Sequence, residues 1–258
     1  MQASEVKLKI QKAIFDKLIN TNNVLSVTIV GSFVDNDDLS GISDIDTVVI
    51  CKNLNRKVFN QCVNNVKTID LQNCGLSNHE LLINTTFGPL KFDRPKVAVI
   101  HLMIYDIYPH RKHVLASPFT CFDWERSQNY KGLSLKDIFP VGLIQVRDFI
   151  EARRSLYNYM EDIKKKKISY KEYYFKNKNI EEIKKEKNLD TRHQGEYAFH
   201  IIKNLVANYL KLISKANINY TDQEIETEIK RLFPKSGSSI SKDFKSISMI
   251  KYQKKHTY

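Results

Sequence analysis

The sequence predicts an α/β (α+β) domain built on a small mixed sheet, followed by an all-helical C-terminal domain. Short apolar segments rich in β-branched residues, typical of strands, fall before residue 135. After that point apolar residues recur at spacings of three and four, which is typical of helices. Strands early and helices late favour two modules of different class. We therefore expect domains at 1–135 and 136–234, and a basic Ser/Lys-rich tail at 235–258 that is weakly ordered or docks elsewhere.

The elements of the N-terminal domain follow from hydrophobic patterning. Apolar residues of 4–20 return every three or four positions, which predicts an opening amphipathic helix. The segment 97–105, VAVIHLMIY, is the clearest strand, because it is long and β-branched. Two further strands are expected at 24–30 and 44–51, and a helix at 54–70. Short extended segments are expected at 80–84 and 86–92.

The second half of the chain is expected to be helical. Helical spacing covers 141–163, 192–214 and 222–233. The Lys-rich segment 164–188 is interpreted as a connector between the first two of these helices. The periodic apolar residues of the first helix are Leu143, Val146, Phe149, Ile150, Leu156, Tyr159 and Met160.

Composition excludes several classes of protein. With 42% hydrophobic and 27% charged residues in a chain of 258, the usage is that of a globular protein, which excludes intrinsic disorder as the main state. The four cysteines form no CxxC pair and no zinc spacing, which excludes a disulfide scaffold. No apolar run approaches the roughly 20 residues of a membrane helix. The N-terminus does not have the pattern of a signal peptide, so we expect a soluble, cytoplasmic protein.

The net charge of +12 is unevenly distributed. Lys and Arg exceed Asp and Glu by two in 1–135 and by ten in 136–258. A basic field of this kind attracts polyanions such as RNA or nucleotides. The alternative is that Lys, like Asn and Ile, is abundant through genomic bias, without any polyanionic ligand.

The segment 27–50 carries the clearest chemical signal. A strand ends at Gly31-Ser32, and eleven residues later a second strand opens with Asp44-Ile45-Asp46. Glycine lets a backbone approach a phosphate, and serine adds a hydroxyl to N–H groups that can hold an anion. Alternation along a strand puts Asp44 and Asp46 on one face, about 7 Å apart, where they repel unless a cation lies between them. Hard oxygen ligands select Mg²⁺ or Mn²⁺.

This combination resembles the signature of the DNA polymerase β-like nucleotidyltransferase superfamily, a strand followed by Gly-Ser, a short gap and Asp-x-Asp before further apolar residues. The resemblance covers roughly 24–106, and the helical half is similar in layout to kanamycin nucleotidyltransferase-like members. It implies transfer of a nucleoside monophosphate from an NTP with release of pyrophosphate. By position, Gly31 and Ser32 would hold the triphosphate, and Asp44 and Asp46 would ligate the metals.

The sequence departs from the family pattern at the third carboxylate, which usually lies in the middle of a later strand. The centre of the matching strand, 97–105, is His101. Either His101 takes that place as a neutral metal ligand or base, or Asp106 supplies the carboxylate from the strand end. Asp93 is a weaker third option. Without a third carboxylate the second metal would bind weakly, and the protein would be slow or would only bind nucleotide.

Two further groups of residues are candidates for ligand contacts. In the segment 84–94, Thr86 and Lys91 could contact the nucleotide, although an edge hairpin is the simpler interpretation. On the helix that begins near residue 192, a polar band at spacings of three, four and seven either faces solvent or faces the acceptor. The members of this band are Arg192, His193, Glu196, His200 and Lys203.

The functional prediction is therefore a Mg²⁺-dependent nucleotidyltransferase that uses an NTP donor and acts on a small-molecule acceptor. Transfer to RNA or to a protein is the alternative suggested by the basic second half. A non-catalytic nucleotidyltransferase-like module that binds RNA or protein is the rival from another class. It is favoured by the missing third carboxylate.

Overall fold

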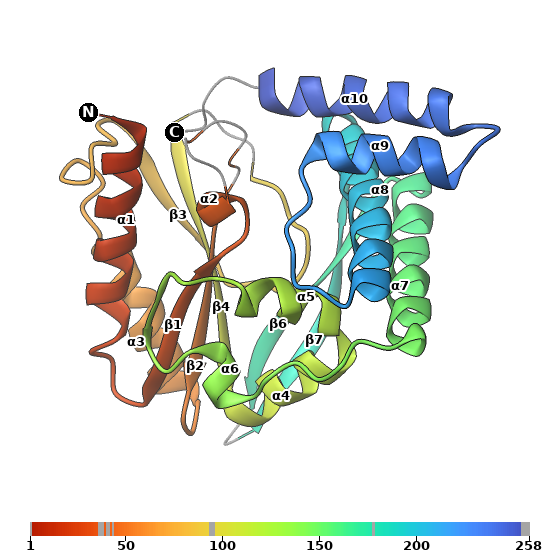
Figure 1. Cartoon of the computed structure of the whole chain (residues 1–258). Helices are drawn as coiled ribbons and strands as arrows, with labels where there is room; N and C mark the ends of the chain where they lie inside the picture. The colour runs from red at the N-terminus through yellow and green to blue at the C-terminus, as the bar shows by residue number, and fades with distance from the viewer. Residues whose placement is uncertain are drawn as a thin grey trace.

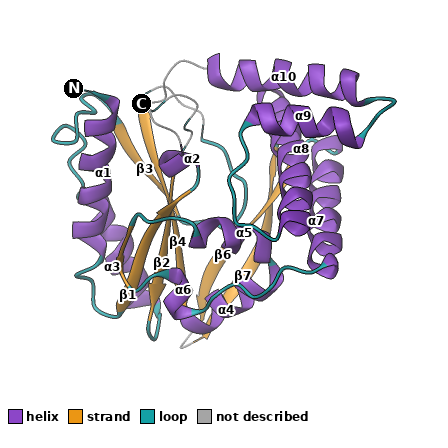
Figure 2. Ribbon diagram, in the orientation of Figure 1, coloured by secondary structure: helices purple, strands orange, loops and turns teal. Residues whose placement is uncertain are grey.

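The structure is a computed structural model that describes residues 2–35, 39, 42, 44–92, 96–176 and 179–253 (Figure 1). An α/β N-terminal part with a five-stranded mixed sheet is followed by mostly helical C-terminal segments (Figure 2), which confirms the predicted fold class. The elements of the N-terminal part are α1 Ala3–Leu18, β1 Val24–Val30, α2 Ser32–Asp35, β2 Ile45–Cys51, α3 Arg56–Lys67, β3 Glu80–Asn84, β4 Val97–Asp106, α4 Ile107–Ala116, α5 Pro118–Glu125, β5 Tyr130–Gly132 and α6 Leu135–Ile138.

The strand order in the five-stranded sheet is β3-β4-β2-β1-β5. β4 runs parallel to β2 and β3, whereas β1 runs antiparallel to β2 and β5. Because β2 and β4 are neighbours and parallel, their residues meet in register, and Asp46 lies beside His101. The topology therefore brings together two side chains that are 55 residues apart in the chain.

The two faces of the sheet are covered by different helices. On one face, α1 and α3 bury Ile10, Ile14 and Val66 against strand residues such as Val49 and Leu102. On the other face, Val48, Met103 and Tyr105 pack against α4, α5 and α6 through side chains such as Val114, Trp124 and Leu135. Asp46 and His101 share the second face by strand alternation, beyond the edge of that apolar cluster.

The second half contains a β-hairpin that the sequence did not reveal. Its elements are α7 Val146–Lys164, β6 Lys167–Lys176, β7 Asn179–Asn188, α8 Thr191–Ser214, α9 Asp222–Leu232 and α10 Gly237–Gln253. The segment interpreted as a connector, 164–188, is mostly the antiparallel pair β6-β7. Three of its lysines pair with glutamates across the strands, as in Lys171–Glu182 at 2.8 Å and Lys185–Glu172 at 2.5 Å. The C-terminal half is thus mostly but not entirely helical.

This hairpin joins the two halves of the chain. The backbone of Phe87 exchanges two hydrogen bonds with that of Lys171, at 2.8 and 2.7 Å. Next to this bridge, the Tyr173 ring packs on Phe59 and Phe87, with centroids 6.1 and 4.8 Å apart. The expected extended segment 86–92 therefore has Phe87 as an isolated bridge to β6 and is not a regular strand.

The expected tail is ordered as far as residue 253. Residues 237–253 form α10, and Phe244 is buried against Phe199 in a stacked pair with centroids 4.9 Å apart. Ile225 and Ile229 of α9 complete this cluster. The segment from Gly237 to Gln253 is thus a helix packed on the rest of the chain, which agrees with the docking alternative and not with weak order, while 254–258 lie outside the described residues.

Two histidines of α4 lie against the sheet face that this helix covers. His110 is 1% exposed, and His113 is half-buried and stacks on Tyr105 with ring centroids 5.4 Å apart. Burial lowers the pKa of each histidine to about 4, and for His110 the neighbouring His113 adds to the effect. Both rings are therefore neutral in the folded protein at neutral pH.

Stability is expected to fall on acidification from about pH 7 to about pH 5. The histidines take up a proton near pH 6.5 in the unfolded chain but only near pH 4 in the folded chain. The free energy of unfolding is therefore highest above pH 6.5 and decreases as the pH falls toward 4, because protonation then favours the unfolded chain. For His110 alone the loss at pH 5 is about 2 kcal/mol. Unfolding free energies at both pH values should show a weaker pH dependence in His110→Phe. The control is His79→Phe, at an exposed loop position, and an unchanged pH dependence in His110→Phe would contradict the assignment.

Candidate functional site

The turn after β1 lies directly against a carboxylate of β2. Gly31 has a φ of +75°, in the region that favours glycine, and a Cβ placed there would lie 2.7 Å from Oδ2 of Asp46. Ser32, the next residue, begins α2. The glycine therefore allows a close approach of the backbone to Asp46, whereas its expected approach to a phosphate stays a prediction.

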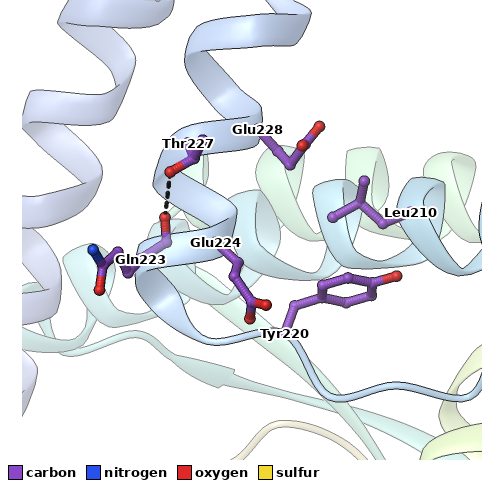
Figure 3. A pocket seen from close by; sticks show the side chains of 6 residues that line it. All are labelled: Leu210, Tyr220, Gln223, Glu224, Thr227 and Glu228. Carbon is purple, nitrogen blue, oxygen red and sulfur yellow. Dashed lines mark hydrogen bonds between the residues drawn. The ribbon is translucent and has the colours of Figure 1, made fainter.

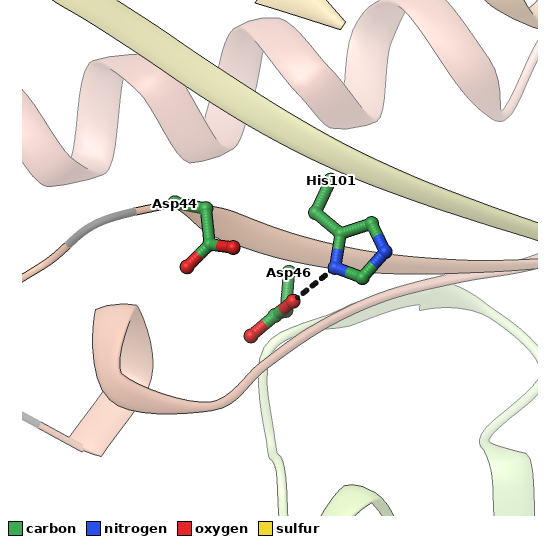
Figure 4. A group of neighbouring side chains, drawn as sticks. All are labelled: Asp44, Asp46 and His101. Atoms are coloured by element: carbon green, nitrogen blue, oxygen red, sulfur yellow. Dashed lines mark hydrogen bonds and ion pairs between the residues drawn. The ribbon is translucent and has the colours of Figure 1, made fainter. Parts of the chain in front are cut away.

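Asp44, Asp46 and His101 form one cluster (Figure 4), in which each residue offers a ligand atom within 4.8 Å of the others. Asp46 belongs to β2 and His101 to β4, while Asp44 directly precedes β2. Among the described residues this is the group of His, Cys, Asp and Glu side chains that could hold a metal ion. The identity of that metal follows only from ligand chemistry, and carboxylate oxygens favour a hard cation.

The ring of His101 is held at both nitrogens. Nδ1 lies 2.7 Å from Oδ1 of Asp46, and Nε2 lies 2.7 Å from the carbonyl oxygen of Thr86. A carbonyl oxygen only accepts, so Nε2 carries a proton and donates it. A second proton is shared between Nδ1 and Asp46. To bind a cation through Nδ1, His101 must first give up that proton.

The electrostatics of the pair favour a cation. Burial and the negative charge of Asp44 raise the pKa of Asp46, and the hydrogen bond from His101 opposes this only in part. Burial lowers the pKa of His101, but the hydrogen bond to Asp46 and the charges of both aspartates outweigh it and raise that pKa. Two half-buried carboxylates close together repel, and a bound divalent ion relieves that repulsion.

A buried lysine connects this cluster to the helical half. Lys91 precedes β4 and forms an ion pair with Glu196 of α8, at 3.5 Å. Burial alone would lower the pKa of Lys91, but the charges of Asp44 and Glu196 outweigh it and raise that pKa well above its usual value. Nearby, the hydroxyl of Tyr197 donates to the carbonyl of Pro89. Lys91 is therefore a permanent positive charge between the aspartates and α8.

The polar band predicted on α8 is partly buried. His193 is 6% exposed, and Nε2 of His200 lies 3.8 Å from Glu196. Burial lowers the pKa of His200 to about 4, which leaves it neutral. Lys203 forms an ion pair with Asp222 at 2.6 Å. Glu196, His200 and Lys203 thus follow one face that continues from Lys91, whereas the side chain of Arg192 lies outside the described residues.

The helix α10 adds a residue that sequence analysis missed. The ammonium groups of Lys203 and Lys251 lie over the ring of Phe199, 5.8 and 5.0 Å from its centroid. Burial and the nearby charge of Lys91 lower the pKa of Lys251 to about 8. The apolar spacing of Ile240, Phe244 and Ile247 was the available signal for this helix.

The expectation that Asp106 completes the metal site is wrong. One carboxylate oxygen of Asp106 accepts from the backbone N–H of Leu54 at 2.6 Å, and the other from that of Ile107 at 2.7 Å. Asp106 therefore caps α4 and lies five residues beyond His101 on β4, about 16 Å away by strand rise. Of the two main candidates for the third position, the structure brings only His101 to the aspartates. Asp93 lies outside the described residues.

Thr86 borders the cluster through its backbone. Its carbonyl accepts from His101, while its hydroxyl and its N–H both bond to Oδ1 of Asn84, at 2.7 and 3.0 Å. The hydroxyl is thus used to fix the turn after β3. A direct contact of this hydroxyl with a nucleotide stays a prediction.

Comparison of the chain with protein-family models, with curated proteins and with solved structures gives no match. Among the described helices none has the length and apolar character needed to cross a membrane. A surface hollow of about 330 Å³ lies between α8 and α9 (Figure 3) and is lined by Leu210, Tyr220, Gln223, Glu224, Thr227 and Glu228. Glu224 in this hollow forms the capping box of α9. None of the lining residues belongs to the aspartate cluster, so the hollow is separate from it.

Replacing Gly31 with alanine is expected to disrupt the site. The new Cβ meets the Asp46 carboxylate and forces a positive φ on a residue that disfavours it, which lowers the free energy of unfolding by about 1–2 kcal/mol. The matched control is Gly142→Ala, where a Cβ meets nothing within 4 Å. Denaturant unfolding of both variants provides the measurement, and equal stability of the two would show that the close approach is not a constraint.

Proposed function

We propose that the protein is a Mg²⁺-dependent nucleotidyltransferase of the DNA polymerase β-like type. The observation that carries the proposal is the contact between the Gly31 turn and the Asp46 carboxylate, with Asp44 within reach of the same ion. A Gly-Ser turn placed against an Asp-x-Asp pair on a mixed sheet is the arrangement that the sequence motif resembles. The metal ligands of this proposal are Asp44 and Asp46.

In the proposed reaction an acceptor hydroxyl or phosphate attacks the α-phosphorus of an NTP in line, and pyrophosphate leaves. A divalent metal at the aspartates supplies charge neutralisation for the phosphates and orients them. His101 holds Asp46 in position through its hydrogen bond and is itself fixed by the Thr86 carbonyl. No covalent intermediate on the protein is required.

The positive charges near the cluster fit a triphosphate. Lys91 lies between the aspartates and α8, and Lys251 and Lys203 extend the positive charge along α8 and α10. Each of these lysines also has acidic or aromatic neighbours that hold its ammonium in place, such as Asp222 for Lys203. Phosphate groups bind well to fixed ammonium groups of this kind.

A small molecule is the better acceptor for this site. The polar band of α8 is partly buried and faces Lys91 instead of forming an open basic surface. Acceptor affinity that falls steeply with salt would instead indicate RNA.

Nucleotide binding provides the direct test. The melting temperature of the wild type is expected to rise with an NTP only when Mg²⁺ is present, because ligands that bind the native state stabilise it. Asp46→Asn should abolish that rise, since it removes a ligand charge from the cluster. Asp16→Asn, on the exposed face of α1, is the control with the same chemical change. Pyrophosphate release with candidate acceptors then measures turnover.

An absence of any Mg²⁺-dependent shift with all NTPs would favour the second candidate, a non-catalytic module. One observation supports that candidate: a histidine bonded to Asp46 occupies the position where the family places its third carboxylate. An RNA-binding module would keep its RNA affinity in Asp46→Asn, whereas a nucleotidyltransferase would lose its metal-dependent binding.

His101→Asp is expected to tighten Mn²⁺ binding by about tenfold, because it adds a third carboxylate beside Asp46. In the absence of metal, the same substitution should lower the free energy of unfolding. It removes the hydrogen bond to the Thr86 carbonyl and adds a third negative charge. His101→Asn removes the same bond without adding charge and is the control. Metal titration by calorimetry distinguishes the two variants, and equal affinities would place the metal away from His101.

A further inference from the structure

The outer face of α7 carries a row of exposed apolar side chains. Leu143, just before the helix, is 70% exposed, Val146 is 64%, Ile150 is 45%, Tyr157 is 57% and Met160 is 41%. We call these five residues the α7 stripe. A surface helix normally presents polar side chains to solvent, and contiguous exposed apolar rows mark interaction sites.

The α7 stripe is separate from the face that α7 uses for the core. The inward side packs through Phe149, whose ring lies 6.0 Å from that of Tyr209 on α8, and through Tyr159 and Ile163. The helix contacts α5, α8 and β6 on that side. In Figure 1, α7 lies at the outer edge of the molecule beyond α8.

The spacing of the α7 stripe is that of a coiled-coil seam. The four members that lie in the helix follow one another at intervals of four, seven and three residues, and Arg153 divides the interval of seven into three and four. This is the alternating three-four pattern of a heptad repeat with one polar residue at its centre. A central polar residue of this kind fixes the register of a helix pair at some cost in stability.

The charges that flank the stripe show how a second helix would align. Arg147, 78% exposed and 3.7 Å from Asp148, flanks its first half, and Glu161, which pairs with Lys164 at 2.7 Å, flanks its second half on the same side. Antiparallel pairing of two copies about a two-fold axis places Arg147 next to Glu161 of the partner subunit, twice. Parallel pairing would place this flank against the opposite flank of the other copy, where Gly142, Phe149 and Leu156 offer no acidic partner. Arg154, which lies near the axis in the antiparallel arrangement, is neutralised by Glu151 at 2.9 Å.

We propose that the α7 stripe is the interface of a two-fold homodimer, in which the α7 helices of two copies pack antiparallel. Ile150 then meets Met160 of the other copy, and the Arg153 guanidinium meets the ring of Tyr157. Charge of both signs along the helix, including Asp148 and Glu151, suits this self-pairing better than an anionic membrane, which favours basic residues alone. The inference does not depend on the proposed nucleotidyl transfer.

Sedimentation velocity at micromolar concentrations tests the dimer. The wild type is expected to sediment as a dimer, and Ile150→Glu to raise the dimer dissociation constant by about 100-fold or more, because it buries an unpaired charge. Leu115→Glu is the control, since Leu115 is 66% exposed on α4, away from the stripe. Far-UV circular dichroism establishes that each variant is folded. A monomeric wild type, or a dimer that Ile150→Glu leaves intact, would overturn the proposal.

A charge exchange tests the antiparallel alignment by itself. Arg147→Glu and Glu161→Arg should each raise the dissociation constant by about five- to tenfold, and the double variant should restore it. Both positions lie at the helix surface, so neither change is expected to unfold the protein. Absence of restoration in the double variant would refute the two-fold antiparallel geometry. The rise in melting temperature with an NTP is measured in the same variants. It is expected to be unchanged, because the exchanged residues lie outside the aspartate cluster, so the two proposals can fail separately.

Discussion

The arrangement of the candidate site depends on the repulsion between two carboxylates that the sheet holds close together. Asp44 and Asp46 lie on one side of β2, and apolar neighbours cannot offset their charge. Two groups offset this negative charge. They are the imidazole of His101, which shares a proton with Asp46, and the ammonium of Lys91. Because Lys91 is also paired with Glu196, the charge balance of the sheet extends into α8. The helical half therefore contributes to the electrostatics of the aspartates.

The sequence predicted the strands that flank Gly31 and Asp46, because hydrophobic patterning and turn residues are local signals. The approach of the Gly31 turn to the Asp46 carboxylate was not predicted, since it depends on how β1 pairs with β2. The third position was harder, since it depends on the register of β4 against β2, which is a contact between distant segments. Asp106 had a local signal of another kind, because an aspartate directly before a helix is a good N-cap.

The hairpin β6-β7 and the helix α10 were missed for a physical reason. Lys and Glu side chains of the hairpin pair across strands and not along them, so the linear sequence shows only a charged connector. In α10 the apolar residues are few, and the serines between them lower its helix propensity. Packing on Phe199 and on α9 supplies what the local sequence lacks.

The two hydrogen bonds between Phe87 and Lys171 affect how the molecule can move. These hydrogen bonds join the segment after β3 to the hairpin β6-β7, which leads into α8. They lie one residue from Thr86, whose carbonyl accepts the hydrogen bond from His101. Such a bridge acts as a pivot, because wide separation of the two halves would break backbone hydrogen bonds in a partly buried place. Relative motion of the two halves is therefore expected to be a rotation about this pivot and not the opening of a hinge between independent lobes.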